Sequence, residues 1–276
     1  MSKWLPEILS FALALSVAGS SSAQDGSAAS EQEARARLKS LQVASPYRIS
    51  DRALSGKIRY ELALADGLSL PETGEQHVET RDGHLVVTIC RDGCGQEAAP
   101  GEAERTRFLR PNRWVQSEDE VISYFAQVGR PSDSVDDRMS LLVKAVTDRM
   151  TGPVEFQHYW SAREAFDYQS GDCSESAVLL AAAARARNIP TRVVAGLAYS
   201  SRFLGGQHLF GPHMWVQSWN GERWVSYDAG LGDFDAGHIA LVLGDGTPAG
   251  FKYVADMIRK LRIISAVGLI RADSAH

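Results

Sequence analysis

The segment Gly171-Asp172-Cys173-Ser174-Glu175-Ser176-Ala177 opens an alanine-rich run that continues to Arg187. The run over residues 178–187 contains neither Gly nor Pro and consists largely of strong helix formers, so we predict a helix there. Asp172 and Glu175 have the spacing of a capping box, which places the helix start at Asp172. Cys173 then lies in the first turn, where free N–H groups and the helix dipole favour a thiolate.

A second segment has the pattern of a β-hairpin, His213-Met214-Trp215-Val216-Gln217-Ser218-Trp219-Asn220-Gly221-Glu222-Arg223-Trp224-Val225-Ser226-Tyr227-Asp228. Asn-Gly between alternating strands is the strongest short-range signal for a two-residue type I′ turn. With this loop Trp219 faces Glu222, and further along the strands His213 faces Asp228 on the same side. Facing residues have Cβ atoms about 4.5–5.5 Å apart, which suits an Asp–His hydrogen bond.

A cysteine at a helix start and a histidine held by an aspartate provide the nucleophile, the base and the orienting group of covalent acyl transfer. The alternative is a cysteine that only packs at a helix start, beside an unrelated surface pair of His213 and Asp228. Because all three residues occur at suitable places, the catalytic interpretation is favoured. Asp233 and Asp235 could compete with Asp228, but they lie off the facing register.

These residues resemble the transglutaminase-like superfamily of papain-type cysteine enzymes. The resemblance covers roughly residues 135–245 and is carried by Ser161-Ala162-Arg163-Glu164-Ala165, Gly171-Asp172-Cys173, residues 185–196, His213-Met214-Trp215 and residues 224–229. It implies an α+β, papain-like core with Cys173 on a helix N-terminus packed against an antiparallel sheet. It also implies that Cys173 is the nucleophile, His213 the general base and acid, and Asp228 the orienting residue.

The sequence departs from the superfamily pattern in two ways, of which the first matters little and the second bears on the expected activity. Met214 stands where the family usually has Ala after the histidine. The sequence also has no calcium-site pattern and none of the additional domains of animal transglutaminases. Bacterial relatives of this kind are often hydrolases, so both hydrolysis and transamidation are expected activities.

The oxyanion of such a reaction needs hydrogen-bond donors near the nucleophile. The backbone N–H of Cys173 is the expected donor because it lies at the helix start. Packing in the core is the stronger alternative for the aromatic residues that could also contribute. The candidates to complete the oxyanion hole or to line the cleft are Tyr159, Trp160, Gln169 and Trp215.

The N-terminus has the pattern of an export signal. An apolar run over residues 8–18 precedes Ser21-Ser22-Ala23, whose small residues suit cleavage after Ala23. A membrane anchor is the alternative, but this run is shorter than the roughly 20 residues needed to span a bilayer. We therefore expect residues 1–23 to be a signal peptide and the mature protein to be periplasmic or secreted, without stable membrane insertion.

The remaining chain divides by its patterns. Residues 24–44 are expected to form a flexible or short helical lead. Residues 45–112 are expected to form a small antiparallel β module, because period-two segments at 47–50, 57–62 and 84–90 are separated by turn signals. Residues 113–276 are then the catalytic domain with a C-terminal extension, in which the amphipathic segment 251–270 is expected to pack against the sheet.

The chain has three cysteines. Cys90 and Cys94 form a close pair, and in an exported protein a disulfide across the turn is the leading interpretation. Two free thiols or half of a metal site are the alternatives; a structural zinc site needs about four ligands. Cys173 is left unpaired, as expected of a reactive thiol, and the predicted chemistry needs no metal or organic cofactor.

The net charge of −5 gives no basic bias that would favour nucleic acid as a partner. The sequence therefore predicts an exported, cysteine-dependent acyl-transfer enzyme acting on amide bonds of peptides or proteins, by hydrolysis or transamidation. The alternative is a non-catalytic transglutaminase-like module that binds peptide or cell-envelope material.

Overall fold

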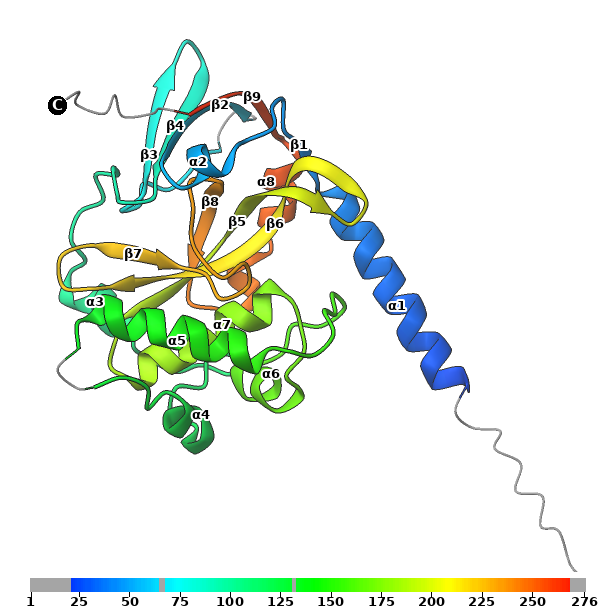
Figure 1. Cartoon of the computed structure of the whole chain (residues 1–276), viewed down its shortest axis with the longest axis vertical. Helices are drawn as coiled ribbons and strands as arrows, with labels where there is room; N and C mark the ends of the chain where they lie inside the picture. Colours follow the sequence, from blue (N-terminus) through cyan, green and yellow to red (C-terminus); the bar gives the residue numbers. More distant parts are fainter. Residues whose placement is uncertain (1–20, 65–67, 131–132, 269–276) are drawn as a thin grey trace, which may run out of the picture.

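The computed structural model describes residues 21–64, 68–130 and 133–268, so most of the predicted signal peptide lies outside the described residues. Figure 1 shows two twisted sheets with helices packed below the larger one. The helices are α1 (Ser21–Ser40), α2 (Asp51–Leu54), α3 (Glu102–Arg107), α4 (Glu120–Phe125), α5 (Val135–Arg149), α6 (Ala162–Tyr168), α7 (Cys173–Ala186) and α8 (Val254–Arg259), with a 3₁₀ turn, η1 (Pro248–Phe251). The strands are β1 (Val43–Ala44), β2 (Lys57–Leu64), β3 (Gln76–Arg81), β4 (His84–Cys90), β5 (Thr191–Phe203), β6 (Gly206–Trp219), β7 (Trp224–Tyr227), β8 (His238–Gly244) and β9 (Leu261–Gly268). This arrangement confirms the predicted α+β class.

Helix α7 begins where the capping box predicts. The Asp172 side chain accepts a hydrogen bond from the Ser174 N–H at 2.7 Å, and the Glu175 carboxyl accepts one from the Asp172 N–H at 2.8 Å. The helix is buried from Ser174 to Arg185, and its alanines leave room for β5 and β6 on one side and α5 and α6 on the other. Close packing of small side chains thus fixes α7, and with it Cys173, against the larger sheet.

The larger sheet has the strand order β1-β6-β5-β8, and β7 also pairs with β6. Because β5 occupies one edge of β6, both β1 and β7 lie along its other edge. β1 pairs at Leu209 and Phe210, whereas β7 pairs over residues 216–219. Between them, the β6 edge at residues 211–215 pairs with no other described strand, and this gap is where the start of α7 docks.

The hairpin between β6 and β7 differs from the predicted register. Trp219 pairs with Trp224 and Gln217 with Ser226, so the loop has four residues, 220–223, instead of two. The Asn220 side chain accounts for the longer loop, because its Oδ1 accepts hydrogen bonds from the N–H groups of Glu222 and Arg223 at 3.0 and 2.9 Å. A shift of two residues leaves each side chain on its original face. Asp228 therefore stays on the face of His213, in a diagonal position.

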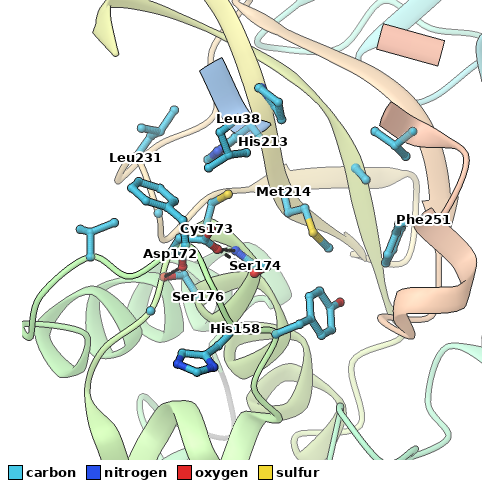
Figure 2. A pocket seen from close by; sticks show the side chains of 18 of the residues that line it. Leu38, His158, Asp172, Cys173, Ser174, Ser176, His213, Met214, Leu231 and Phe251 are labelled. Atoms are coloured by element: carbon cyan, nitrogen blue, oxygen red, sulfur yellow. Dashed lines mark hydrogen bonds between the residues drawn. The ribbon is translucent and has the colours of Figure 1, made fainter. Parts of the chain in front are cut away.

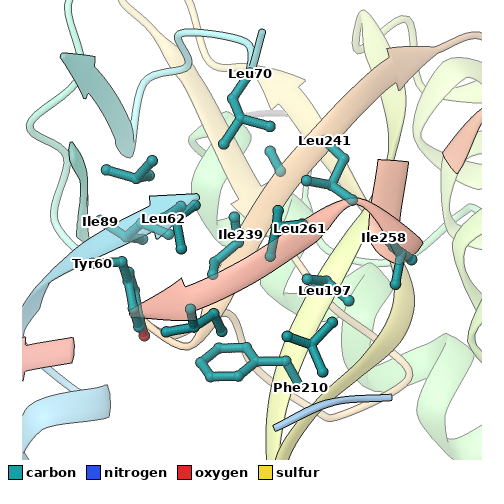
Figure 3. Packing of buried hydrophobic residues seen from close by; sticks show 14 of the residues in the cluster. Tyr60, Leu62, Leu70, Ile89, Leu197, Phe210, Ile239, Leu241, Ile258 and Leu261 are labelled. Carbon is teal, nitrogen blue, oxygen red and sulfur yellow. The ribbon is translucent and has the colours of Figure 1, made fainter. Parts of the chain in front are cut away.

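The second sheet has the order β3-β4-β2-β9. The predicted strands at 57–62 and 84–90 are present, whereas residues 47–50 form no strand and lead into α2, which Ser50 caps. The C-terminal β9 pairs with β2, so this sheet is built from both ends of the chain. One buried cluster joins the two sheets, with Tyr60 of β2 packed edge-on against Phe210 of β6 (Figure 3).

The described part of the amphipathic segment, residues 251–268, contains the end of η1, α8 and β9, and it packs on the sheets as expected. Of the helices in the described part of the chain, none is both long and apolar enough to cross a bilayer.

Candidate active site

Cys173 is the unpaired cysteine of the described chain, and its side chain is half-buried. The N–H of Met214, in the gap along β6, donates a hydrogen bond to the thiol. The first turn of α7 thus meets the strand that carries His213, and Cys173 and His213 both line one cavity (Figure 2).

The surroundings of Cys173 in the folded chain oppose the predicted thiolate. Burial raises the pKa of the Cys173 thiol well above its usual value, and the carboxylates of Asp172 and Asp228 raise it further. The Met214 N–H opposes this rise but does not cancel it. The helix N-terminus alone therefore does not ionise the thiol, and a base is needed to remove its proton.

His213 and Asp228 are in direct contact. The His213 Nε2 lies 2.7 Å from the Asp228 Oδ2, and both side chains are buried. Because the carboxylate is ionised, Nε2 carries the proton and donates it. Nδ1 makes no hydrogen bond to any described residue, which leaves its lone pair free to accept a proton.

A second histidine, His238 at the start of β8, was not predicted and also contacts Asp228. Its Nε2 lies 3.1 Å from the Asp228 Oδ2, and its Nδ1 lies 3.0 Å from the Asp235 Oδ1. His238 is thus enclosed between two carboxylates in a buried position. Asp235, which lies off the register of the hairpin, thus contacts His238 on the side of the ring away from Asp228.

The charges of this group reinforce one another. Burial would lower the pKa of His238, but the hydrogen bonds to Asp228 and Asp235 raise it to about 9, so the ring carries a positive charge at neutral pH. Burial would raise the pKa of Asp228, but the two histidines lower it well below its usual value. A charged His238 therefore helps to keep Asp228 ionised.

The other oxygen of Asp228 is held by the backbone. Its Oδ1 accepts hydrogen bonds from the N–H groups of Gly230 and Leu231 at 2.7 and 3.2 Å. This turn also lies against the nucleophile, because a Cβ added to Gly230 would be 3.4 Å from the Cys173 Cα. The turn after β7 thereby packs the orienting carboxylate and the first residue of α7 together.

Glu175 lies two residues after the nucleophile and is fully buried. Burial and the neighbouring Asp172 carboxylate raise its pKa to about 8, so it is largely neutral at pH 7. Its oxygens accept hydrogen bonds from the N–H groups of Trp160 and Asp172, both at 2.8 Å. Glu175 therefore ties the segment before α6 to the start of α7.

Of the four candidates for the oxyanion hole or cleft, the structure places one on the cavity. Tyr159 lines it, but its hydroxyl donates to the Gly246 carbonyl at 2.9 Å. Trp160 and Gln169 lie outside the lining, and Gln169 is the left-handed C-cap of α6. Trp215 is buried, and its ring stacks on that of His213 with the ring centroids 6.0 Å apart. It therefore supports the imidazole and does not line the cleft.

His213, Asp228 and His238 also lie close enough to suggest a metal site, with one potential ligand atom from each within 4.8 Å of the others. Metal binding requires neutral imidazoles, and the raised pKa of His238 works against it. The hydrogen bonds to two carboxylates account for the cluster without a metal. Far from this site, Cys90 and Cys94 form a disulfide at the end of β4.

The cavity at Cys173 has a volume of about 600 Å³. Its polar lining includes the start of α7 and His213, together with Arg37, Thr147, His158, Tyr159 and Ser170. Its other walls are largely apolar and include Leu38, Leu41, Val154, Phe156, Phe203, Met214, Leu231, Phe251, Val254, Ala255 and Ile258.

Residues 125–229 match the sequence model of the transglutaminase-like superfamily. This segment contains Cys173, His213 and Asp228. No curated protein sequence matches the chain.

Among solved structures, the periplasmic domain of TgpA from Pseudomonas aeruginosa is similar, with 15% identity, a TM-score of 0.46 and coverage of 74% of this chain and 95% of that one. A candidate cysteine protease from Cytophaga hutchinsonii has 15% identity and a TM-score of 0.43, covering 79% and 84% of the two chains. Red sea bream transglutaminase has 12% identity and a TM-score of 0.33, covering 64% and 47%.

Proposed function

We propose that this protein is a cysteine-dependent acyl-transfer enzyme that acts on amide bonds of peptides or proteins. The observation that carries the proposal is the contact of Asp228 with the imidazole of His213, which leaves Nδ1 free at a cavity that also contains Cys173. The superfamily match over the same residues supports it.

In the proposed reaction, His213 Nδ1 accepts the thiol proton as the Cys173 sulfur attacks the carbonyl carbon. Burial raises the pKa of the thiol, so the proposed reaction relies on His213 as the base. The Cys173 N–H, at the open start of α7, is the proposed donor to the oxyanion. His213 then gives the proton to the departing amine, and a thioester remains on the sulfur.

The thioester is resolved by a second acceptor. Water, deprotonated by His213, gives a carboxylic acid, whereas a primary amine gives a new amide; in both cases the sulfur leaves and recovers its proton. Asp228 stabilises the imidazolium formed in each half-reaction, and His238 and the Gly230 turn hold Asp228 in place.

We also propose that the protein is exported. The support is the N-terminal sequence, with its apolar run and the small residues before Gln24. Cleavage after Ala23 would leave most of α1 in the mature protein, including Leu38 at the cavity, and Leu41 directly after the helix.

The experiment that tests the proposed function is turnover of a peptide library by the mature protein, with and without a primary amine, alongside Cys173→Ala. We expect wild-type turnover and at least a thousandfold loss in the variant, because no other described nucleophile is paired with His213. Removing one small side chain at a helix start should leave the folding transition nearly unchanged. Equal turnover by both proteins would refute the enzyme, and no turnover by either would favour the alternative, a binding module.

A further inference from the structure

Two walls of the cavity at Cys173 come from outside the superfamily segment 125–229. Leu38 of α1 and Leu41, directly after that helix, form the first wall, the α1 wall. Phe251, with Val254 and Ile258 of α8, forms the second, the α8 wall. In Figure 2, Met214 lies between Cys173 and Phe251. The space beside the nucleophile is therefore shaped by the two ends of the chain.

The α8 wall has a clear chemical character. Phe251, Val254, Ala255 and Ile258 recur at three- and four-residue spacing and line the cavity. The charged residues of the same segment, Lys252, Asp256, Arg259 and Lys260, are exposed and lie outside its lining. The segment thus presents an uncharged face to the cavity and its charges to solvent.

The α1 wall is fixed in position by contacts with the rest of the chain. The Phe156 N–H donates to Glu31 at 2.8 Å, and the Gln42 amide donates to the Phe203 carbonyl at 2.9 Å. The guanidinium of Arg35 lies 4.9 Å from the centre of the Phe156 ring. Leu41, which is 7% exposed, consequently lies against the cavity in a defined place.

The few charged groups that line the cavity do not serve this apolar side. The Asp172 carboxylate is engaged by the N–H and hydroxyl of Ser174, both at 2.7 Å. Arg37 is exposed on α1, His158 is exposed and stacks on the ring of Trp160, and His213 is held by Asp228. A charged or carboxamide group placed against Phe251 and Ile258 would lose its water without gaining a partner.

We propose that Leu41, Met214, Phe251, Val254, Ala255 and Ile258 form a subsite for a bulky apolar group on the acyl side of the substrate. The inference rests on the proposed function, because it takes Cys173 as the point of attack. His213 must reach the leaving amine, which assigns the side near His213 to the leaving group and the side along Met214 and Phe251 to the acyl group. The apolar group belongs either to an amino-acid side chain or to a fatty acyl chain.

The first test compares substrates that share one leaving group and differ in the acyl part: Phe, Leu, Ala, Gln and Glu derivatives and a decanoyl derivative. We expect kcat/KM for Phe or Leu, or for decanoyl, to exceed that for Ala and Gln by at least about tenfold, with Glu lowest. Preference for Phe and Leu assigns the subsite to a side chain, and preference for decanoyl assigns it to an acyl chain. A kcat/KM for the Gln or Glu derivative equal to that of the best apolar substrate would overturn the proposal.

The second test places a charge in the subsite. Ala255 is half-buried on the cavity side of α8, whereas Tyr253 is 61% exposed and lies outside this cavity. Ala255→Glu should lower kcat/KM for apolar substrates at least about tenfold, and Tyr253→Glu, with the same change in charge, should stay within about twofold. Ala255→Lys should raise the ratio of Glu to Leu turnover. No difference between the Ala255 and Tyr253 variants would contradict the subsite.

A binding measurement separates this inference from the proposed function. The uncharged fluorophore N-phenyl-1-naphthylamine should bind the Cys173→Ala protein and lose at least about tenfold in affinity when Ala255→Glu is added. If Ala255→Glu weakens fluorophore binding but no Cys173-dependent turnover is found, the apolar site is supported and the proposed enzyme activity is rejected. Cys173-dependent turnover without apolar preference, and a fluorophore insensitive to Ala255→Glu, would reject the subsite alone.

Discussion

Asp228 is the residue on which the candidate site converges. Its two oxygens accept hydrogen bonds from two imidazoles and two backbone N–H groups, so its position and charge are both determined. A carboxylate held in this way cannot turn away from His213 without breaking several bonds at once. The tautomer of His213 follows from that fixed partner.

His238→Gln tests whether this support matters for catalysis. Loss of the charged hydrogen bond to Asp228 should lower kcat by roughly ten- to a hundredfold with little change in KM, because such bonds contribute about 1.5–3 kcal/mol. The downfield proton resonance of the His213 Nε2–H should also shift. His84→Gln is the control. His84, at the start of β4, is paired with Glu61 of β2, and neither residue lines the cavity. An unchanged kcat and resonance would show that Asp228 does not depend on His238.

The state of the resting thiol can be measured by alkylation. Because burial raises the pKa of the Cys173 thiol, its reaction rate with iodoacetamide should keep rising as the pH increases through neutrality. A thiolate already paired with an imidazolium would instead give a plateau beginning below pH 7. That plateau would contradict the neutral resting thiol.

At this scale the sequence predicts the three residues of the proposed triad but not their surroundings. The spacing of Asp172 and Glu175 indicates where α7 begins, because capping depends on neighbouring residues. His238 is missed because its contact with Asp228 is made through the fold. The only local signal is Asp235 three residues before it, and the hairpin register relates that aspartate to His213 alone.

At the scale of elements, the gap along β6 is what brings the site together. β7 is short and ends opposite Val216, so the Met214 N–H meets the Cys173 thiol instead of a strand. The predicted two-residue turn fails because the Asn220 side chain caps a longer loop. The Asp–His contact survives this error because a shift of two residues preserves the face.

Glu75, directly before β3 of the second sheet, holds β7 in place, and Glu75→Ala tests this role. Its buried carboxyl accepts hydrogen bonds from the Ser226 N–H at 2.9 Å and from the Gln217 amide at 3.1 Å. The unpaired groups should lower the free energy of unfolding by about 1–3 kcal/mol and reduce Tm by several degrees. Glu75→Gln should lower the free energy of unfolding by less. Glu79→Ala, at an exposed position, should leave it unchanged. An unchanged Tm for Glu75→Ala would show that β7 holds its place without it.

At the scale of the whole molecule, both chain ends contribute to structure that local patterns do not reveal. The period-two segments predict β2 and β4, but the pairing of β9 with β2 depends on contacts between residues about 200 apart. The amphipathic pattern of residues 251–270 predicts packing against the sheet. It does not predict that the apolar face of α8 would line the cavity at Cys173.

The buried titratable groups predict how stability depends on pH. Burial raises the pKa of Glu75 to about 7 and of Glu175 to about 8, and carboxylate contacts raise that of His238 to about 9 against the effect of its burial. Each group binds its proton more tightly in the folded state, so its contribution is complete below its unfolded pKa and is lost as the pH rises through the folded one. Asp228, whose pKa is lowered, acts oppositely and loses its contribution only in strong acid.

Urea unfolding between pH 4 and pH 9.5 checks this dependence. The free energy of unfolding should be highest at mildly acidic pH and should fall by on the order of a few kcal/mol by pH 9. Glu75→Gln should flatten the curve between about pH 4.5 and 7, and His238→Gln between about pH 6.5 and 9. A free energy that rises steadily from pH 5 to pH 9 would contradict these assignments.

The central claim is that the Cys173 sulfur carries the acyl group during turnover. Its most direct test is intact-protein and peptide mass spectrometry after rapid acid quenching of a reaction with an activated ester. We predict one acyl group per chain, on the peptide containing Cys173, which is removed on longer incubation and does not form in Cys173→Ala. Turnover of the ester without any adduct on Cys173, or with equal speed in Cys173→Ala, would contradict it.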